Sequence, residues 1–145
     1  MKIAVTGAGL RTPLLIHGLA RAQNELAIEK LLLFDQDFER AELMATLGPE
    51  VARESGMQIC STRRIEEAVE GCAFVISSIR VGGMEARARD ERIALEHGFA
   101  GQETTGPGGL AMALRTIPQA IEYARIVERR APGAWIVNFT NRRAW

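Results

Sequence analysis

The 145-residue sequence has no excess of charge of either sign and contains only two cysteines. Lysine and arginine together number 18, and so do aspartate and glutamate. A net charge of zero offers no electrostatic attraction to nucleic acid or to an anionic membrane, so we expect neither as a partner. Cys60 and Cys72 are too far apart for a Cys-x-x-Cys motif, and we expect both to be buried, inert thiols.

The sequence also lacks a long hydrophobic run. No apolar stretch approaches the roughly 18 residues that span a bilayer. The first residues lead from a strand-like segment directly into a glycine turn, without a signal peptide, so we expect a cytoplasmic protein. His17 and His97 have no partner at metal-ligand spacing, and we expect them to be structural or solvated. The length suffices for one domain with its own core, and we assign residues 1–145 to it.

A glycine turn follows the strand-like residues 2–6 and is the most informative feature of the chain. Gly7 can adopt the positive φ of a tight turn, and Gly9 lets the backbone approach a ligand closely. We expect Thr12 to be the N-cap and Pro13 the first residue of a helix. The N–H groups and the positive end of that helix would then point at one place, where a pyrophosphate can bind.

The glycine pattern is incomplete, however. Counted from Gly7, the pattern G-x-G-x-x-G places Thr12 where the third glycine belongs. A partial match is a weak signal by itself. It gains weight because a strand-like segment precedes it and a helix start follows it.

Asp35 ends the second strand-like segment, 28 residues after Gly7. In a dinucleotide-binding fold an acid at this position accepts hydrogen bonds from the adenosine ribose hydroxyls. A carboxylate would repel a 2′-phosphate, so Asp35 favours NAD over NADP. The alternative is a loop or helix-capping aspartate, since Asp37 and Glu39 follow closely.

Strand-like and helix-like segments alternate along the whole chain. We expect strands at residues 3–6, 31–35, 57–61, 72–79 and 134–139, and helices at 12–23, 38–55, 65–70, 85–97 and 110–130. Gly48-Pro49 should kink or divide the second helix, and Pro118 should bend the last one. The alternation predicts an α/β fold: a Rossmann-like, doubly wound, mainly parallel sheet with helices on both faces.

A second glycine run occupies residues 101–109, with four glycines and one proline. Such a loop brings polar side chains and backbone N–H groups close to a small ligand before a helix starts. The alternative is a long turn with no ligand.

Several segments together resemble glycoside hydrolase family 4, in the branch of the 6-phospho-β-glucosidases. They are RTPLL at 11–15, RVGGMEAR at 80–87, DER at 90–92, GQET at 101–104, GPGG at 106–109, ALRTIP at 113–118 and NFTN at 138–141. The resemblance spans essentially the whole chain, and the RVGG and GQET segments are far more specific than the glycine turn.

The resemblance implies an unusual hydrolase that uses NAD and a divalent metal, usually manganese, and acts on 6-phospho-glucosides. In the family, NAD oxidises the C3 hydroxyl of the sugar, a base removes the C2 proton, the aglycone is eliminated, and water adds back before the ketone is reduced. By position, Gly7, Gly9, Leu10, Arg11 and Asp35 would hold NAD, with Arg80, Val81 and Gly82 on the nicotinamide side. Arg87 would bind the substrate phosphate, and Glu103 and Asn141 would contact sugar hydroxyls.

The sequence departs from the family pattern in two ways. Its first turn is one residue shorter, with Leu10 in place of a serine and its neighbour. Family members also continue well past the equivalent of Asn141, and their metal-binding cysteine and histidine and their tyrosine base lie in that continuation. We therefore expect no catalytic or metal-binding residue within this chain, and cofactor binding without turnover by the chain alone.

The sequence leaves two interpretations of the chain's function open. The chain is either the cofactor-binding part of such a glycosidase or a stand-alone dinucleotide-binding or regulatory module. A small dehydrogenase is disfavoured, because the sequence has no Tyr-x-x-x-Lys pair and no histidine–aspartate pair placed for hydride transfer. Without the family's second domain an apolar surface would be exposed, so we expect a homo-oligomer.

Overall fold

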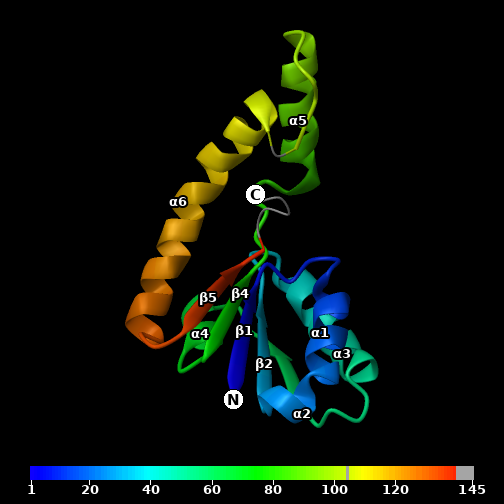
Figure 1. The fold of residues 1–145 in the computed structure, drawn as a ribbon, viewed down its shortest axis with the longest axis vertical. Coiled ribbons are helices and arrows are strands. Elements are labelled where there is room, and N and C mark those ends of the chain that lie inside the picture. The colour runs from blue at the N-terminus through cyan, green and yellow to red at the C-terminus, as the bar shows by residue number, and fades with distance from the viewer. Residues whose placement is uncertain (104, 140–145) are drawn as a thin grey trace. The chain divides into compact units, whose positions relative to one another are not determined.

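The computed structural model describes residues 1–103 and 105–139, which form two compact units. The first unit comprises Met1–Ser78 and Ala124–Phe139, and the second comprises Ile79–Tyr123. Figure 1 shows a sheet with helices in the first unit and a pair of helices in the second. The assignment of residues 1–145 to one domain stays a prediction.

The first unit is built on one five-stranded parallel sheet with the strand order β3-β2-β1-β4-β5. The strands are β1 Lys2–Thr6, β2 Lys30–Phe34, β3 Gln58–Ser61, β4 Phe74–Ser77 and β5 Trp135–Asn138. The chain starts in the middle, builds outward to β3 and returns to the other side of β1. This order is that of a dinucleotide-binding fold, and ligands bind where the strand order reverses, outside the carboxyl ends of β1 and its neighbours.

Helices cover both faces of this sheet, as the sequence predicted (Figure 1). Successive strand residues point to opposite faces. Ile3 and Val5 belong to the buried cluster that also contains residues of α1 Thr12–Arg21 and α3 Phe38–Val51. The alternate residue Ala4 is fully buried on the other face, where α4 Ile65–Val69 contacts β1 and β2.

The ends of several elements differ from the prediction. Helix α1 begins at Thr12 with Arg11 as its N-cap, so Thr12 is the first helical residue and not the cap. A short separate helix, α2 Gln23–Leu26, follows it. Helix α3 runs without a break through Pro49 and ends before residue 52. Its N-cap Asp37 accepts a hydrogen bond from the Arg40 N–H, which satisfies one of the free donors of the first turn.

The second unit contains α5 Gly83–Glu96 and most of α6 Gly106–Arg130. Helix α6 starts four residues earlier than predicted, so the glycines of the second glycine run from Gly106 onward lie in its first turn and not in a loop. Gly108 has a packing reason, because a Cβ there would lie 2.5 Å from the Gln102 carbonyl oxygen. The helix also continues past Pro118, so this proline does not end it.

Candidate functional site

The glycine turn of the first unit lies at the carboxyl end of β1, beside the end of β2. The Gly7 N–H donates to the Phe34 carbonyl at 2.8 Å, so the turn is tied to the residue that precedes Asp35. Gly7 has φ 90°, a conformation that other residues rarely adopt. The Thr12 N–H donates to the Gly9 carbonyl at 2.9 Å, which closes the turn onto the start of α1.

The space around this turn fits a phosphate-bearing ligand. A Cβ placed on Gly9 would meet no atom within 4 Å, so the backbone there is open to an approaching group. Leu10 is 91% exposed and Arg11 is exposed, so both precede the helix on the surface. The N–H groups of the first helical turn and the positive end of the dipole then favour an anion. A pyrophosphate therefore suits the residues present. Thr12, which stands where the glycine pattern has its third glycine, is buried.

Asp35 follows β2 directly and is positioned by local backbone contacts. Its Oδ1 accepts a hydrogen bond from the Asp37 N–H at 2.9 Å, and its side chain is 13% exposed. The Arg40 guanidinium lies 4.0 Å from the same oxygen. The helix-capping role belongs to Asp37, so the alternative reading of Asp35 as the cap of α3 is wrong. Because the Gly7 N–H donates to the carbonyl of Phe34, the residue before Asp35, the Asp35 backbone lies beside the glycine turn.

In the second unit, residues Arg80–Gly83 form a β-turn. The Gly83 N–H donates to the Arg80 carbonyl at 3.1 Å. Gly82 has φ 81° and ψ 1°, close to the values of about +80° and 0° that define the third residue of a type II turn. The resemblance places Arg80, Val81 and Gly82 on the nicotinamide side, and the positive φ explains why a glycine occupies position 82.

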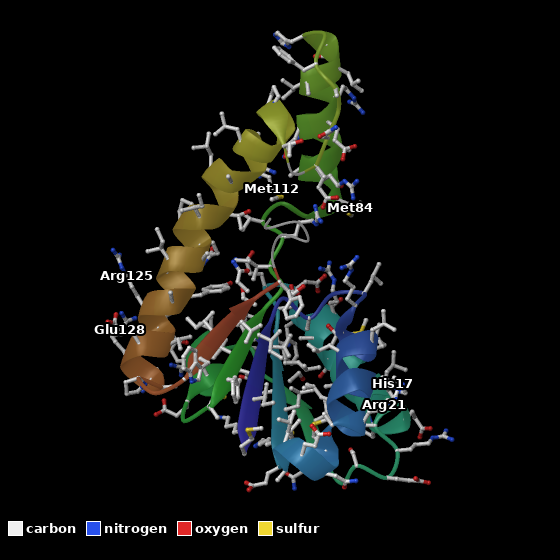
Figure 2. All side chains as sticks on the ribbon, in the orientation of Figure 1. His17, Arg21, Met84, Met112, Arg125 and Glu128 are labelled. Carbon is white, nitrogen blue, oxygen red and sulfur yellow. The ribbon has the colours of Figure 1, made fainter. Side chains whose placement is uncertain are left out.

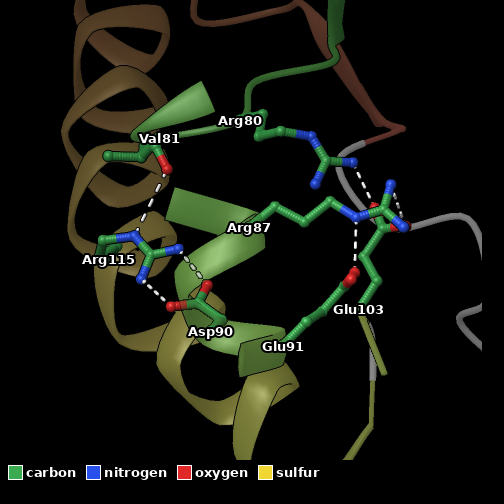
Figure 3. A network of polar contacts seen from close by, with 7 residues as sticks. All are labelled: Arg80, Val81, Arg87, Asp90, Glu91, Glu103 and Arg115. Atoms are coloured by element: carbon green, nitrogen blue, oxygen red, sulfur yellow. Dashed lines mark hydrogen bonds and ion pairs between the residues drawn. The ribbon is translucent and has the colours of Figure 1, made fainter. Parts of the chain in front are cut away.

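A network of arginine–carboxylate pairs follows this turn (Figure 3). Glu103 pairs with Arg80 and also with Arg87, whose Nη1 lies 3.1 Å from Glu103 Oε2. The Arg87 Nε donates to Glu91 Oε1 at 2.7 Å, one helical turn along α5. All of these residues line one pocket of the second unit. Arg87 and Glu103, which the resemblance assigns to different parts of the substrate, are thus partners of each other in the structure.

The charges of this pocket stabilise one another. The hydrogen bond from Arg80, together with the charge of Arg87, lowers the pKa of Glu103 below its ordinary value, so Glu103 is ionised at neutral pH. The hydrogen bond to Glu91 raises the pKa of Arg87. The pocket therefore offers guanidinium groups that are already occupied by carboxylates.

A second ion pair lies in the same pocket and was not anticipated from the sequence. Arg115 of α6 binds Asp90 of α5 through two hydrogen bonds, Nη1–Oδ1 at 2.9 Å and Nη2–Oδ2 at 2.6 Å. The Asp90 side chain is 9% exposed. Both residues belong to segments that carry the resemblance, DER and ALRTIP, but only the fold brings them together, across 25 positions of the chain.

The remaining sequence-predicted residues have simple environments. Asn141 lies outside the described residues. Cys72 is buried, donates its thiol to the Ala68 carbonyl, and has its pKa raised by burial, whereas Cys60 is only half-buried. His17 lies on the exposed side of α1 (Figure 2). His97 contacts the Ile93 carbonyl of its own helix at 2.9 Å.

Two kinds of feature are absent from the described residues. Residues 1–103 and 105–139 contain no group of three or more histidine, cysteine or acidic side chains arranged to hold a metal ion. Over the same ranges, none of the helices is both long enough and apolar enough to pass through a bilayer.

The strand order and the glycine turn after β1 define the class of the protein as a Rossmann-like dinucleotide-binding fold. Comparison with known proteins then gives the family. The profile described as "Family 4 glycosyl hydrolase" matches residues 2–144. The chain belongs to this family.

Characterised relatives include enzymes for both anomers. The chain is 38% identical to the 6-phospho-beta-glucosidase of Escherichia coli over 97% of its own length and 32% of the relative's. It is 36% identical to 6-phospho-alpha-glucosidase 1 of Lacticaseibacillus paracasei over 93% and 31% of the two chains. The chain thus spans about a third of the length of the curated relatives that it matches.

A solved relative shares the fold closely. The 6-phospho-beta glucosidase of Thermotoga maritima, determined with manganese, NAD+ and glucose-6-phosphate, has a TM-score of 0.92 and 35% identity. The match covers 98% of this chain and 35% of the solved one. The predicted resemblance and fold class are confirmed.

The Asp90–Arg115 pair makes the second unit's stability depend on pH. Arg115 holds the pKa of Asp90 below its ordinary value of 3.8, so the pair stabilises fully above that pH and loses its contribution as the pH falls through the lower folded-state value. Asp90→Asn should therefore reduce the free energy of unfolding by about 1–2 kcal/mol at pH 7. The difference from the unsubstituted chain should shrink below pH 3.8. Urea unfolding at pH 7 and in acid measures this, and an equal difference at both pH values would contradict the assignment.

Proposed function

We propose that the chain is the NAD-binding part of an NAD- and metal-dependent glycosidase that hydrolyses 6-phospho-glucosides. The observation that carries the proposal is the Gly7 turn, which is hydrogen-bonded to the end of β2 beside Asp35 at the switch point of the sheet. Family membership and the cofactor named for the Thermotoga maritima relative support it. Because the chain spans about a third of its relatives, the activity is proposed for the whole enzyme and not for this part alone.

In this proposal the residues of the first unit bind and orient the cofactor. Gly7 and Gly9 give the pyrophosphate access to backbone N–H groups, with Leu10 and Arg11 at the edge of the turn. The Asp35 carboxylate accepts from the adenosine ribose, and its charge disfavours a 2′-phosphate. Bound NAD would supply the hydride acceptor for oxidation of the sugar at C3.

The second unit contributes the nicotinamide-side turn and the substrate contacts. Arg80, Val81 and Gly82 would line the nicotinamide, Arg87 would bind the substrate phosphate, and Glu103 and Asn141 would contact sugar hydroxyls. The planar fork of an arginine suits a phosphate because it donates two hydrogen bonds at once. The Glu103 carboxylate now holds Arg87, so we infer that an arriving phosphate exchanges with it.

The alternative function is a stand-alone dinucleotide-binding or regulatory module. Its support is that the described residues hold a turn for a cofactor but no cluster that could ligate a metal. Such a module would bind NAD and would not require a sugar phosphate. The described residues contain no group of three or more histidine, cysteine or acidic side chains that could hold manganese. The anomer of the substrate is also left open, because relatives of both kinds match the chain.

The proposal includes a location and a partner. NAD and a sugar phosphate are charged solutes that do not cross a bilayer unaided, which supports the cytoplasm as the location.

Helix α6 carries four apolar residues at spacings of four, three and four positions that are 47–67% exposed: Leu110, Leu114, Ile117 and Ile121. Exposed apolar stripes of this kind mark contact surfaces, which supports a homo-oligomer. Light scattering at high concentration should detect a species larger than the monomer, and a monodisperse monomer would contradict it.

Replacing Asp35 by alanine tests the cofactor site. The change removes the ribose acceptor, so NAD affinity should fall about 10- to 100-fold, the effect of losing hydrogen bonds to a charged group. Calorimetric titration with NAD measures the affinity. Asp37→Ala is the matched control, because it removes a carboxylate two residues away that caps α3, and it should leave NAD affinity within about twofold of the unsubstituted value.

Three outcomes of that titration are distinct. Weakening by the Asp35 substitution alone supports the site. Equal weakening by both substitutions would show that only the stability of α3 was changed. No binding by the unsubstituted chain would refute the proposed cofactor role.

Glu103→Gln tests the exchange at Arg87. The substitution removes the carboxylate that now neutralises Arg80 and Arg87, so the affinity for inorganic phosphate should rise about three- to tenfold. Phosphate is titrated at constant ionic strength, because added salt would screen the effect. Glu85→Gln removes the same charge from the exposed start of α5 and is the control. Equal phosphate affinity in the two variants would contradict the exchange.

A further inference from the structure

We propose that Arg115, held by Asp90, is a positioning residue that sets the orientation of the Val81–Gly82 peptide for the cofactor. The inference rests on the proposed NAD site but adds residues that neither the family match nor the glycine turn assigns. Its evidence is the way one guanidinium group divides its donors between a buried carboxylate and a turn (Figure 3).

The guanidinium of Arg115 is fixed by its two contacts to Asp90. The Nη1 and Nη2 groups both donate to that carboxylate, at 2.9 and 2.6 Å, which is the bidentate geometry that arginine forms best. Because Asp90 is nearly fully buried on α5, it cannot turn to solvent as an alternative partner. The plane of the guanidinium, and hence the direction of its third donor, is therefore determined by α5.

The third donor of Arg115 points at the turn. Its Nε donates to the Val81 carbonyl at 3.5 Å, a long hydrogen bond. The position that a Cβ on Gly82 would occupy lies 3.6 Å from the same nitrogen and only 2.6 Å from the Ala86 Cβ. A side chain at position 82 would therefore collide with α5, and the turn is packed directly against Arg115.

The direction of the Val81 carbonyl decides the type of this turn. Types I and II differ chiefly by a reversal of the central peptide plane, and the type II orientation requires the positive φ that Gly82 has. In a planar trans peptide the C=O and the N–H point in opposite directions. A carbonyl held toward Arg115 therefore presents the Gly82 N–H on the opposite side of the turn, as a donor whose direction is fixed in advance.

A Gly82 N–H with a fixed direction suits a ligand that places an acceptor oxygen, such as a ribose oxygen, on that side of the turn. If Arg80, Val81 and Gly82 line the nicotinamide half of NAD, the Gly82 N–H is the group that Arg115 orients for it. Arg115 lies on the carbonyl side of this peptide, so in this proposal it acts on the nicotinamide half through the Gly82 N–H. Its loss should therefore affect the nicotinamide half of the cofactor and leave the adenosine half unchanged.

The test compares NAD with ADP-ribose, which has the same adenosine and pyrophosphate but lacks nicotinamide. Arg115→Lys keeps the positive charge and removes the planar fork. It should lower NAD affinity about tenfold and change ADP-ribose affinity less than twofold. Asp90→Asn should have the same selective effect, and the double substitution should add little to either one. Arg125→Lys, on the exposed side of the same helix (Figure 2), should change neither affinity.

Equal losses for NAD and ADP-ribose would overturn the inference, because Arg115 would then act only through stability. Binding of neither ligand by the unsubstituted chain would instead refute the proposed function. A measurement without ligand tests the inference in that case also. The three-bond HN–Hα couplings of Gly82 in the NMR spectrum report its φ, and they should change in Arg115→Lys. Unchanged couplings would overturn the positioning role whatever the ligand affinities are.

Discussion

The parallel pairing of β1 with β2 on one side and β4 on the other is the constraint on which the structure depends. It places the chain's first strand in the middle of the sheet and brings the carboxyl ends of neighbouring strands to one edge. The hydrogen bond from the Gly7 N–H to the Phe34 carbonyl extends this pairing beyond the strands. Gly7 and Asp35, far apart in sequence, thereby become neighbours, which is the arrangement that the proposed dinucleotide site requires.

The second unit is organised by charge and not by a sheet. Arginines are satisfied by carboxylates of the same unit: Arg80 and Arg87 by Glu103, and Arg115 by Asp90. The pairs of Glu103 and the Asp90–Arg115 pair have different roles in the proposed function. Both carboxylates line the same pocket, but Glu103 is 28% exposed, so in the proposed function an incoming anion replaces it. Asp90 is only 9% exposed and its bidentate pair with Arg115 joins α5 to α6, which suits it to fix geometry.

Local patterns predicted the elements well because each pattern has a local cause. Strand-like segments that alternate with helix-like ones predicted the parallel sheet, and the glycine turn after β1 with an acid after β2 predicted the dinucleotide fold. The predicted ends of two elements differ from the structure: α3 continues through Pro49, and α6 begins at Gly106, in a first turn where Gly108 packs closely against the Gln102 backbone. The Asp90–Arg115 pair could not be predicted, since only the packing of two helices brings the residues together.

The central claim is that the carboxyl edge around β1 is a dinucleotide site. Titration of the isotope-labelled chain with NAD, followed by backbone amide NMR shifts, tests it most directly. The account predicts that the largest shifts fall on Gly7, Gly9 and the residues around Asp35, while amides at the opposite end of the sheet, near Glu29, stay unchanged. Shifts that are absent, or that are concentrated away from the Gly7 turn, would contradict the account.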